Sequence, residues 1–169
     1  MIQNPKDQYC WTRVSISIGV GLFLLALALS AVIVPQLVYL HLLQALIYLA
    51  VLVLTQRNNA WGYGIGVIVP TAWNCLNLFV THLFQKGAVQ VWSLIHSGQF
   101  WFLLRTGQVS RPDTLTVMIG GAAHVLIIVA CGAGFLHLRP RGRQWGQFFG
   151  GGVLALAYFA LIIAIAAPR

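Results

Sequence analysis

Three polar side chains follow one another along an apolar segment at the spacing of a helix face. His41, Gln44 and Tyr48 are separated by three and four residues, and Thr55 lies two helical turns further on. Residues at this spacing share one side of an α-helix. Imidazole, amide and phenol groups donate and accept hydrogen bonds without carrying a charge, so such a face can recognise a neutral or weakly polar ligand.

A second polar stripe lies in the next apolar segment, and a histidine lies in a later one. Thr71, Asn74 and Asn77 recur at helical spacing, and His124 is near the middle of its own apolar run. A polar side chain that faced lipid would lack hydrogen-bond partners, which is costly, so the stripes should face inward. The sequence therefore predicts an intramembrane polar pocket with these seven residues: His41, Gln44, Tyr48, Thr71, Asn74, Asn77 and His124. The alternative is that the same groups only join helices to one another by hydrogen bonds.

The residues that are absent limit the chemistry of this pocket. Asp7 and Asp113 are the only acidic residues, so a catalytic carboxylate pair or a Ser-His-acid triad cannot be assembled. The three cysteines are far apart in the sequence and form no CxxC redox pair. We predict no catalytic residue, and we interpret the chain as non-catalytic.

The histidines are compatible with a bound cofactor. Haem or a quinone can be held through His41 and His124, although bis-histidine haem needs two imidazoles at matched depth. The depths of His41 and His124, counted in residues from the outer ends of their helices, differ by roughly 7 Å at 1.5 Å per residue. This difference in depth weighs against haem. A copper or zinc site from His41, Cys75 and His82 is conceivable, but no ligand-spacing motif supports it.

The composition predicts the elements that position these side chains. Hydrophobic residues make up 59% of the 169 positions and charged residues only 7%, whereas soluble domains carry about 25% charged residues. A span needs about 20 apolar residues to cross the hydrocarbon layer. We therefore expect a single domain over residues 1–169 that is all-α, a polytopic transmembrane helix bundle. Its five predicted spans are about 14–34, 37–55, 61–84, 115–136 and 145–167.

The segment at about 87–104 is different in character. It is apolar but short for a span, and polar residues interrupt it. Trp92 and Trp101 suit the boundary between water and lipid. We predict an interfacial amphipathic helix here, with a sixth span or a re-entrant helix as the alternatives.

Glycine pairs indicate where helices pack closely. Gly62 and Gly66, and likewise Gly146 and Gly150, are at the GxxxG spacing. Small residues let transmembrane helices approach each other. These four glycines are predicted helix-packing residues, within this bundle or against another membrane subunit or a second copy.

The basic residues predict the orientation. With five spans and the N-terminus cytoplasmic, six basic residues fall on the cytoplasmic side and four on the outer side, which agrees with the positive-inside rule. The cytoplasmic set is Lys6, Arg13, Arg57, Arg139, Arg141 and Arg143. We expect an integral protein of a bacterial-type inner membrane. Nucleic acid is not an expected partner, because the basic residues are scattered beside apolar helices.

Three functions fit these features. The first is a non-catalytic subunit of a larger membrane assembly, since the chain is small and lacks a catalytic set. The second is a small transporter or substrate-binding membrane component for a neutral or weakly polar ligand. The third is a haem- or quinone-binding redox subunit that uses His41, Tyr48 or His124.

Overall fold

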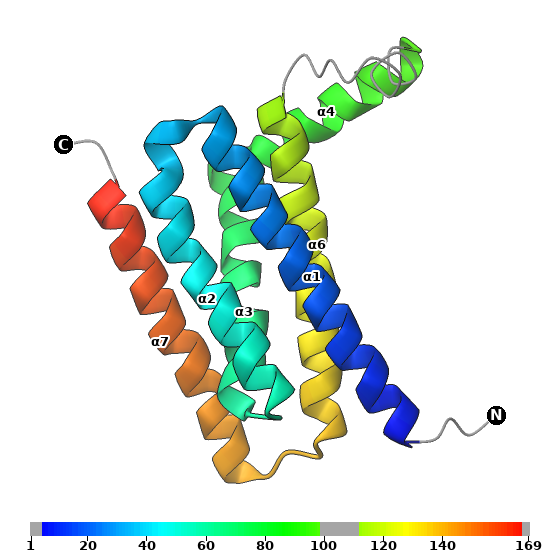
Figure 1. The fold of residues 1–169 in the computed structure, drawn as a ribbon, viewed down its shortest axis with the longest axis vertical. Coiled ribbons are helices and arrows are strands. Elements are labelled where there is room, and N and C mark those ends of the chain that lie inside the picture. Colours follow the sequence, from blue (N-terminus) through cyan, green and yellow to red (C-terminus); the bar gives the residue numbers. More distant parts are fainter. Residues whose placement is uncertain (1–4, 99–111, 167–169) are drawn as a thin grey trace.

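The computed structural model describes residues 5–98 and 112–166, which form a bundle of long helices (Figure 1). Within these ranges there are helices and no strands. Five of the described helical segments are long and apolar enough to cross a membrane: Trp11–Ile33, Pro35–Gln56, Ala60–Val80, Thr116–His137 and Gly142–Ile165. The predicted all-α membrane helix bundle with five spans is thus confirmed.

The helices have the following bounds. The long ones are α1 (Pro5–Ile33), α2 (Val38–Gln56), α3 (Ala60–Cys75), α6 (Pro112–His137) and α7 (Gly142–Ala166), and a shorter helix α4 covers Leu83–His96. The 3-10 helix η1 (Pro35–Leu37) precedes α2, and the π-helix η2 (Leu76–Val80) continues α3.

Short connections hold α1, α2 and α3 next to one another. Pro35 begins η1, where its fixed φ suits a first helical turn and its missing N–H costs nothing. Between α2 and α3, the side chain of Asn59 accepts a hydrogen bond from the backbone N–H of Trp61 at 2.9 Å and so caps α3. Together these two connections place α2 in contact with both α1 and α3.

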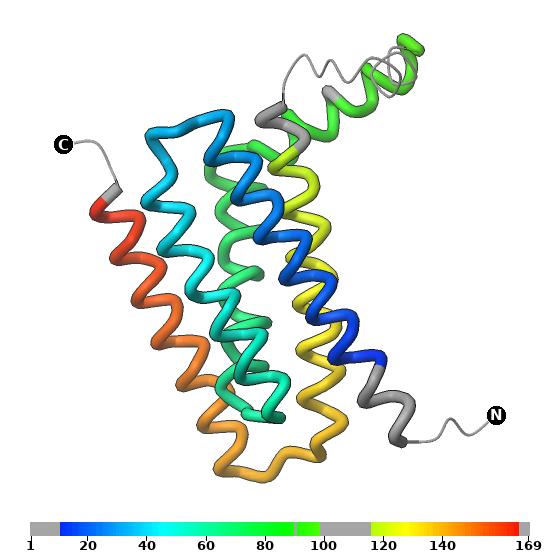
Figure 2. Tube along the Cα trace, in the orientation of Figure 1, coloured from blue at the N-terminus to red at the C-terminus, as the bar shows by residue number. Residues whose placement is uncertain are grey.

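Helix α3 has three long helices as neighbours. It packs against α2, α6 and α7, while α1 packs mainly along α6 (Figure 2). The side chains between these helices are large and apolar, among them Phe23, Val51, Ile127 and Phe135. His124 on α6 is fully buried in this interior, Asn74 on α3 is half-buried, and Thr71 on α3 is exposed.

Glycines allow α3 to approach its neighbours. A β-carbon on Gly62 would lie 2.9 Å from the backbone nitrogen of Thr55, and one on Gly66 would lie 3.1 Å from a methyl carbon of Val51. Such distances leave no room for a larger residue without a shift of the helices. Gly62 thus lies where α3 packs against α2, and Gly66 lies between α2 and Cys131 of α6.

Within this chain, the predicted glycines of α7 do not mark its closest approach to α3. Nothing lies within 4 Å of a β-carbon placed on Gly146, and Gly150 would meet only a Trp61 ring atom at 3.9 Å. The close approach falls at Gly151, where a β-carbon would lie 2.8 Å from the carbonyl oxygen of Trp61. Since successive helical residues point about 100° apart, a one-residue difference in position places a different face against α3.

The third span and the predicted surface helix also differ from expectation. We expected one helix to continue to residue 84, but the candidate span ends at Val80, and His82 takes a left-handed backbone conformation (φ 54°). This residue redirects the chain, and α4 begins directly after it. Figure 1 shows α4 running away from the end of the bundle, at an angle to the spans.

Helix α4 has 14 residues and is too short to cross the membrane. Trp92 is largely exposed on it, while Trp101 and the rest of the predicted segment beyond residue 98 lie outside the described residues. A membrane-surface location for α4 stays a prediction.

Candidate functional site

A hydrogen bond between α2 and α6 lies in the interior of the bundle. The hydroxyl oxygen of Tyr48 is 2.6 Å from Nε2 of His124. Tyr48 is 2% exposed and His124 is fully buried. Each residue therefore satisfies the polar atom of the other at a depth where neither water nor headgroups are available.

Asn74 completes this arrangement from α3. Its side-chain oxygen is 3.2 Å from Nδ1 of His124. An amide oxygen only accepts hydrogen bonds, so Nδ1 of the imidazole donates to it and Nε2 accepts the hydroxyl proton of Tyr48. Both nitrogens of a neutral histidine are satisfied in this way. We call Tyr48, His124 and Asn74 the polar triad.

Aromatic rings enclose the triad. Phe23 from α1 packs on both Tyr48 and His124, with a centroid distance of 4.1 Å in each case. The ring of Trp73 stands edge-on to the imidazole at 4.7 Å. These rings exclude water and fix the orientation of the imidazole. The position of the Asn74 amide is thereby fixed as well.

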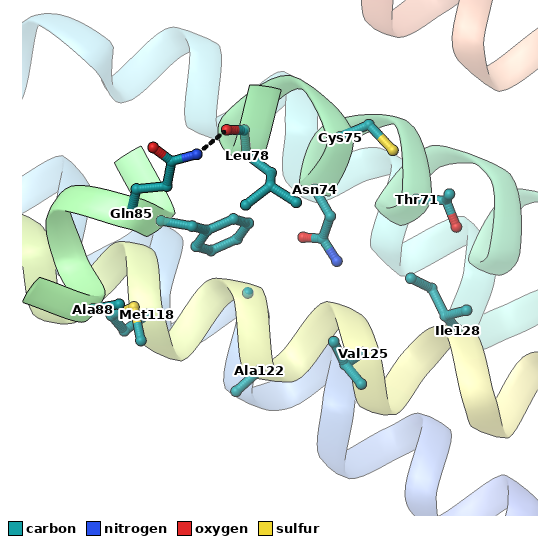
Figure 3. Close-up of a pocket in the computed structure, with 12 residues that line it drawn as sticks. Thr71, Asn74, Cys75, Leu78, Gln85, Ala88, Met118, Ala122, Val125 and Ile128 are labelled. Carbon is teal, nitrogen blue, oxygen red and sulfur yellow. Dashed lines mark hydrogen bonds between the residues drawn. The ribbon is translucent and has the colours of Figure 1, made fainter. Parts of the chain in front are cut away.

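A groove lies beside the triad, on the outer surface of the bundle between α3, α4 and α6 (Figure 3). Its volume is about 630 Å³, within the range of small-molecule sites. Apolar and small residues form most of its wall. The lining residues are Thr71, Asn74, Cys75, Leu78, Phe84, Gln85, Ala88, Met118, Gly121, Ala122, Val125 and Ile128.

The polar groups on the groove wall are few, and most have local partners. The Thr71 hydroxyl donates to the carbonyl of Val67 at 2.6 Å, and the Gln85 amide donates to the carbonyl of Leu78 at 3.4 Å. Asn74 differs from them. Its oxygen accepts from His124, and within the described residues its amide nitrogen donates to no other group. Figure 3 shows this side chain pointing from α3 toward α6 at the wall of the groove.

Helix α4 forms one end of the groove. The ring of Phe84 lies on the backbone of Gly121, where a β-carbon would overlap the ring. Phe84 also meets Trp73 edge-to-face at 5.7 Å. Because Gly121 has no side chain, α4 can pack directly on α6.

The other predicted pocket residues lie elsewhere. His41 is buried on the Tyr48 face of α2, but Nδ1 of its ring is 2.6 Å from the carbonyl of Leu37 in its own helix. Gln44 is also buried on that face, and neither residue lines the groove. Asn77 is buried too, and its amide donates to the carbonyl of Trp73 at 2.9 Å. The structure therefore brings together Tyr48, Asn74 and His124, with Thr71 on the groove wall.

The structure does not fit the haem hypothesis. Both nitrogens of His124 are used by protein groups, and Phe23 and Trp73 pack against its ring. A metal site from His41, Cys75 and His82 is not assembled either, because no group of three or more metal-ligating side chains occurs in the described part of the chain. A neutral quinone is a different case, since it needs only a hydrogen-bond donor and an apolar wall.

Sequence reasoning gave no role in the site to three residues that shape it. Phe23 and Phe84 are apolar residues in apolar surroundings, so their types give no signal. Gly121 belongs to an adjacent glycine pair inside a span, which was a usable indication of close packing.

The fold and the site define an integral, multi-pass membrane protein with a polar triad beside an open groove. Comparisons with protein-family models, with curated proteins and with solved structures find no match for this chain.

Proposed function

We propose that this protein binds a neutral, membrane-soluble molecule in the groove between α3, α4 and α6. The bound molecule carries a carbonyl-type oxygen that accepts a hydrogen bond from the amide nitrogen of Asn74. The observation that carries the proposal is this amide. It is fixed by His124, borders the groove, and has an unused donor among the described residues. The protein then acts as a substrate-binding membrane component.

The groove wall supports a largely apolar ligand. Leu78, Val125 and Ile128 present hydrocarbon, and Ala122 and Gly121 leave space between them. None of the described residues that line the groove is Asp, Glu, Lys or Arg, so a charged ligand would lose its hydration without gaining a counter-charge from them. A neutral molecule already dissolved in the bilayer pays no such cost.

The triad supports a ligand with a hydrogen-bond acceptor. Because His124 donates to the oxygen of Asn74, the amide cannot rotate freely, and its N–H₂ group keeps one direction. A donor that is already oriented loses little entropy when it binds an acceptor. Ring carbonyls of quinones and ester carbonyls of neutral lipids both match this donor.

The depth of Asn74 separates these two ligand types. It lies six residues before the end of the third span, or about 9 Å along the helix axis. A quinone ring can reach that depth more readily than a lipid ester, which stays close to the polar headgroup region. The geometry thus favours a quinone-class carbonyl.

A matched pair of valines tests the location. Val125 and Val129 are both exposed on α6, at 56% and 64%, but only Val125 lines the groove. Wild-type protein and the variants Val125→Phe and Val129→Phe are reconstituted in nanodiscs, and binding of a short-chain quinone is measured from its retention by native mass spectrometry. Val125→Phe should lose binding because its ring fills the groove, while Val129→Phe should bind as the wild type does. Equal binding by all three proteins would remove the groove from the proposal.

A further inference from the structure

Arg13 has an unusual environment near the start of α1. Its Nε is buried, yet this atom has no hydrogen-bond partner in the part of the chain that the structure describes. A buried N–H of a charged group that lacks an acceptor is costly. An acceptor from outside the chain would remove that cost.

Polar groups from two helices meet one turn further along α1. The Ser17 hydroxyl, one turn after Arg13, donates to the carbonyl of Arg13 at 3.0 Å. The amide of Gln56, at the end of α2, donates to the same Ser17 hydroxyl at 3.1 Å. The next residue, Arg57, is exposed and adds a second positive charge at this end of the bundle. The start of α1 and the end of α2 thus form a polar, positively charged corner.

The chain offers little to neutralise this corner. Asp7 and Asp113 are the only acids in the sequence. Asp113 belongs to the first turn of α6, at the opposite end of the bundle (Figure 1). Asp7 precedes Arg13 by six positions, which is not the three- or four-residue spacing of paired side chains on a helix. An anion from the surroundings can supply the missing acceptor.

We propose that Arg13 binds the phosphate of an anionic phospholipid headgroup. The first candidate span begins at Trp11, a largely exposed residue of the type that marks the membrane boundary, so Arg13 lies near the depth of the headgroups. A guanidinium can donate two parallel hydrogen bonds to a phosphate, one of them from Nε. This site is independent of the α3–α4–α6 groove and of the ligand proposed there.

Lipid retention tests the site. Wild-type protein is reconstituted in vesicles with equal amounts of phosphatidylglycerol and phosphatidylcholine, extracted in mild detergent, and the bound lipid is identified by native mass spectrometry. The wild type should retain phosphatidylglycerol in excess. Arg13→Lys keeps the charge, and hence the membrane orientation, but lacks Nε and the two-pronged geometry. Its retention should fall by about fivefold.

Arg143→Lys, which also keeps the charge, serves as the matched control. Arg143 is exposed in the first turn of α7 and lies outside the corner, so its substitution should leave retention unchanged. Ser17→Ala, which keeps Arg13, should reduce retention less than Arg13→Lys does. Displacement of the lipid from the wild type by millimolar inorganic phosphate would support an anion site at Arg13 but assign it to free phosphate. Equal phosphatidylglycerol retention by wild type and Arg13→Lys would overturn the proposal.

Discussion

The hydroxyl of Tyr48 and Nε2 of His124 lie 2.6 Å apart, although 76 positions separate the two residues in the chain. This bond joins α2 to α6, and the second ring nitrogen joins α6 to Asn74 on α3. One imidazole therefore links three spans. Because a neutral imidazole accepts at one nitrogen and donates at the other, the order of donors runs from Tyr48 through His124 to Asn74.

Removal of the Tyr48 hydroxyl should destabilise the bundle. Tyr48→Phe keeps the ring that packs on Phe23 but leaves Nε2 of His124 buried without a donor, at a cost of about 1–3 kcal/mol. The measurement is the free energy of unfolding in mixed micelles. Tyr158→Phe is the control, because its hydroxyl makes only a long, exposed bond of 3.4 Å to the carbonyl of Leu43. Equal stabilities for the two variants would argue against an energetic role for the triad.

The close approach of α3 and α7 gives a second test. A β-carbon on Gly64 would overlap the backbone carbonyl of Phe148, which cannot move without the whole helix. Gly64→Ala should therefore cost roughly 2 kcal/mol or more. Gly146→Ala should be neutral or stabilising by up to about 1 kcal/mol, because alanine is the better helix former and nothing lies nearby. Thermal unfolding of the two variants checks this order, and the reverse order would contradict the packing described here.

A third prediction concerns His41. This residue was among the strongest candidates in the sequence, yet its imidazole bonds to Leu37 within its own helix and does not reach the groove. His41→Gln should change the affinity of a short-chain quinone by less than about twofold, or ~0.4 kcal/mol. Titration of the variant in nanodiscs measures this. A loss as large as that of a groove-filling variant would return His41 to the binding site.

The fold was largely predictable, because five apolar runs of sufficient length leave few alternatives in a membrane. The end of the third span was not. Apolar residues such as Phe79 and Val80 continue the pattern to the left-handed turn at His82, and nothing in the hydropathy marks the change to a π-helix or the new direction of α4. Backbone conformation at one residue decided that boundary.

The site was predictable in its residue types but not in its pairing. Helical spacing put Tyr48 and Asn74 on polar faces, and the sequence suggested that His124 joins them. Periodicity cannot say whether a short polar side chain bonds across the bundle or to a carbonyl four residues earlier. Asn77 and Thr71 do the latter. The relative rotation and depth of α3 and α6 decide the difference, and those depend on packing over the whole helix.

Some expectations stay predictions. They are the cytoplasmic N-terminus, the bacterial-type inner membrane, membership of a larger assembly and a role in transport. The groove and the triad support the proposal of ligand binding and test none of these four expectations.

The most direct measurement compares Asn74→Leu with the wild type, using a short-chain quinone and a hydrocarbon of matching size that lacks carbonyls. Leucine has nearly the shape of asparagine but no donor, so quinone affinity should fall about tenfold, the equivalent of ~1.4 kcal/mol for one hydrogen bond. The affinity of the hydrocarbon should stay the same. Unchanged quinone affinity, or an equal loss for both molecules, would contradict recognition of a carbonyl by Asn74.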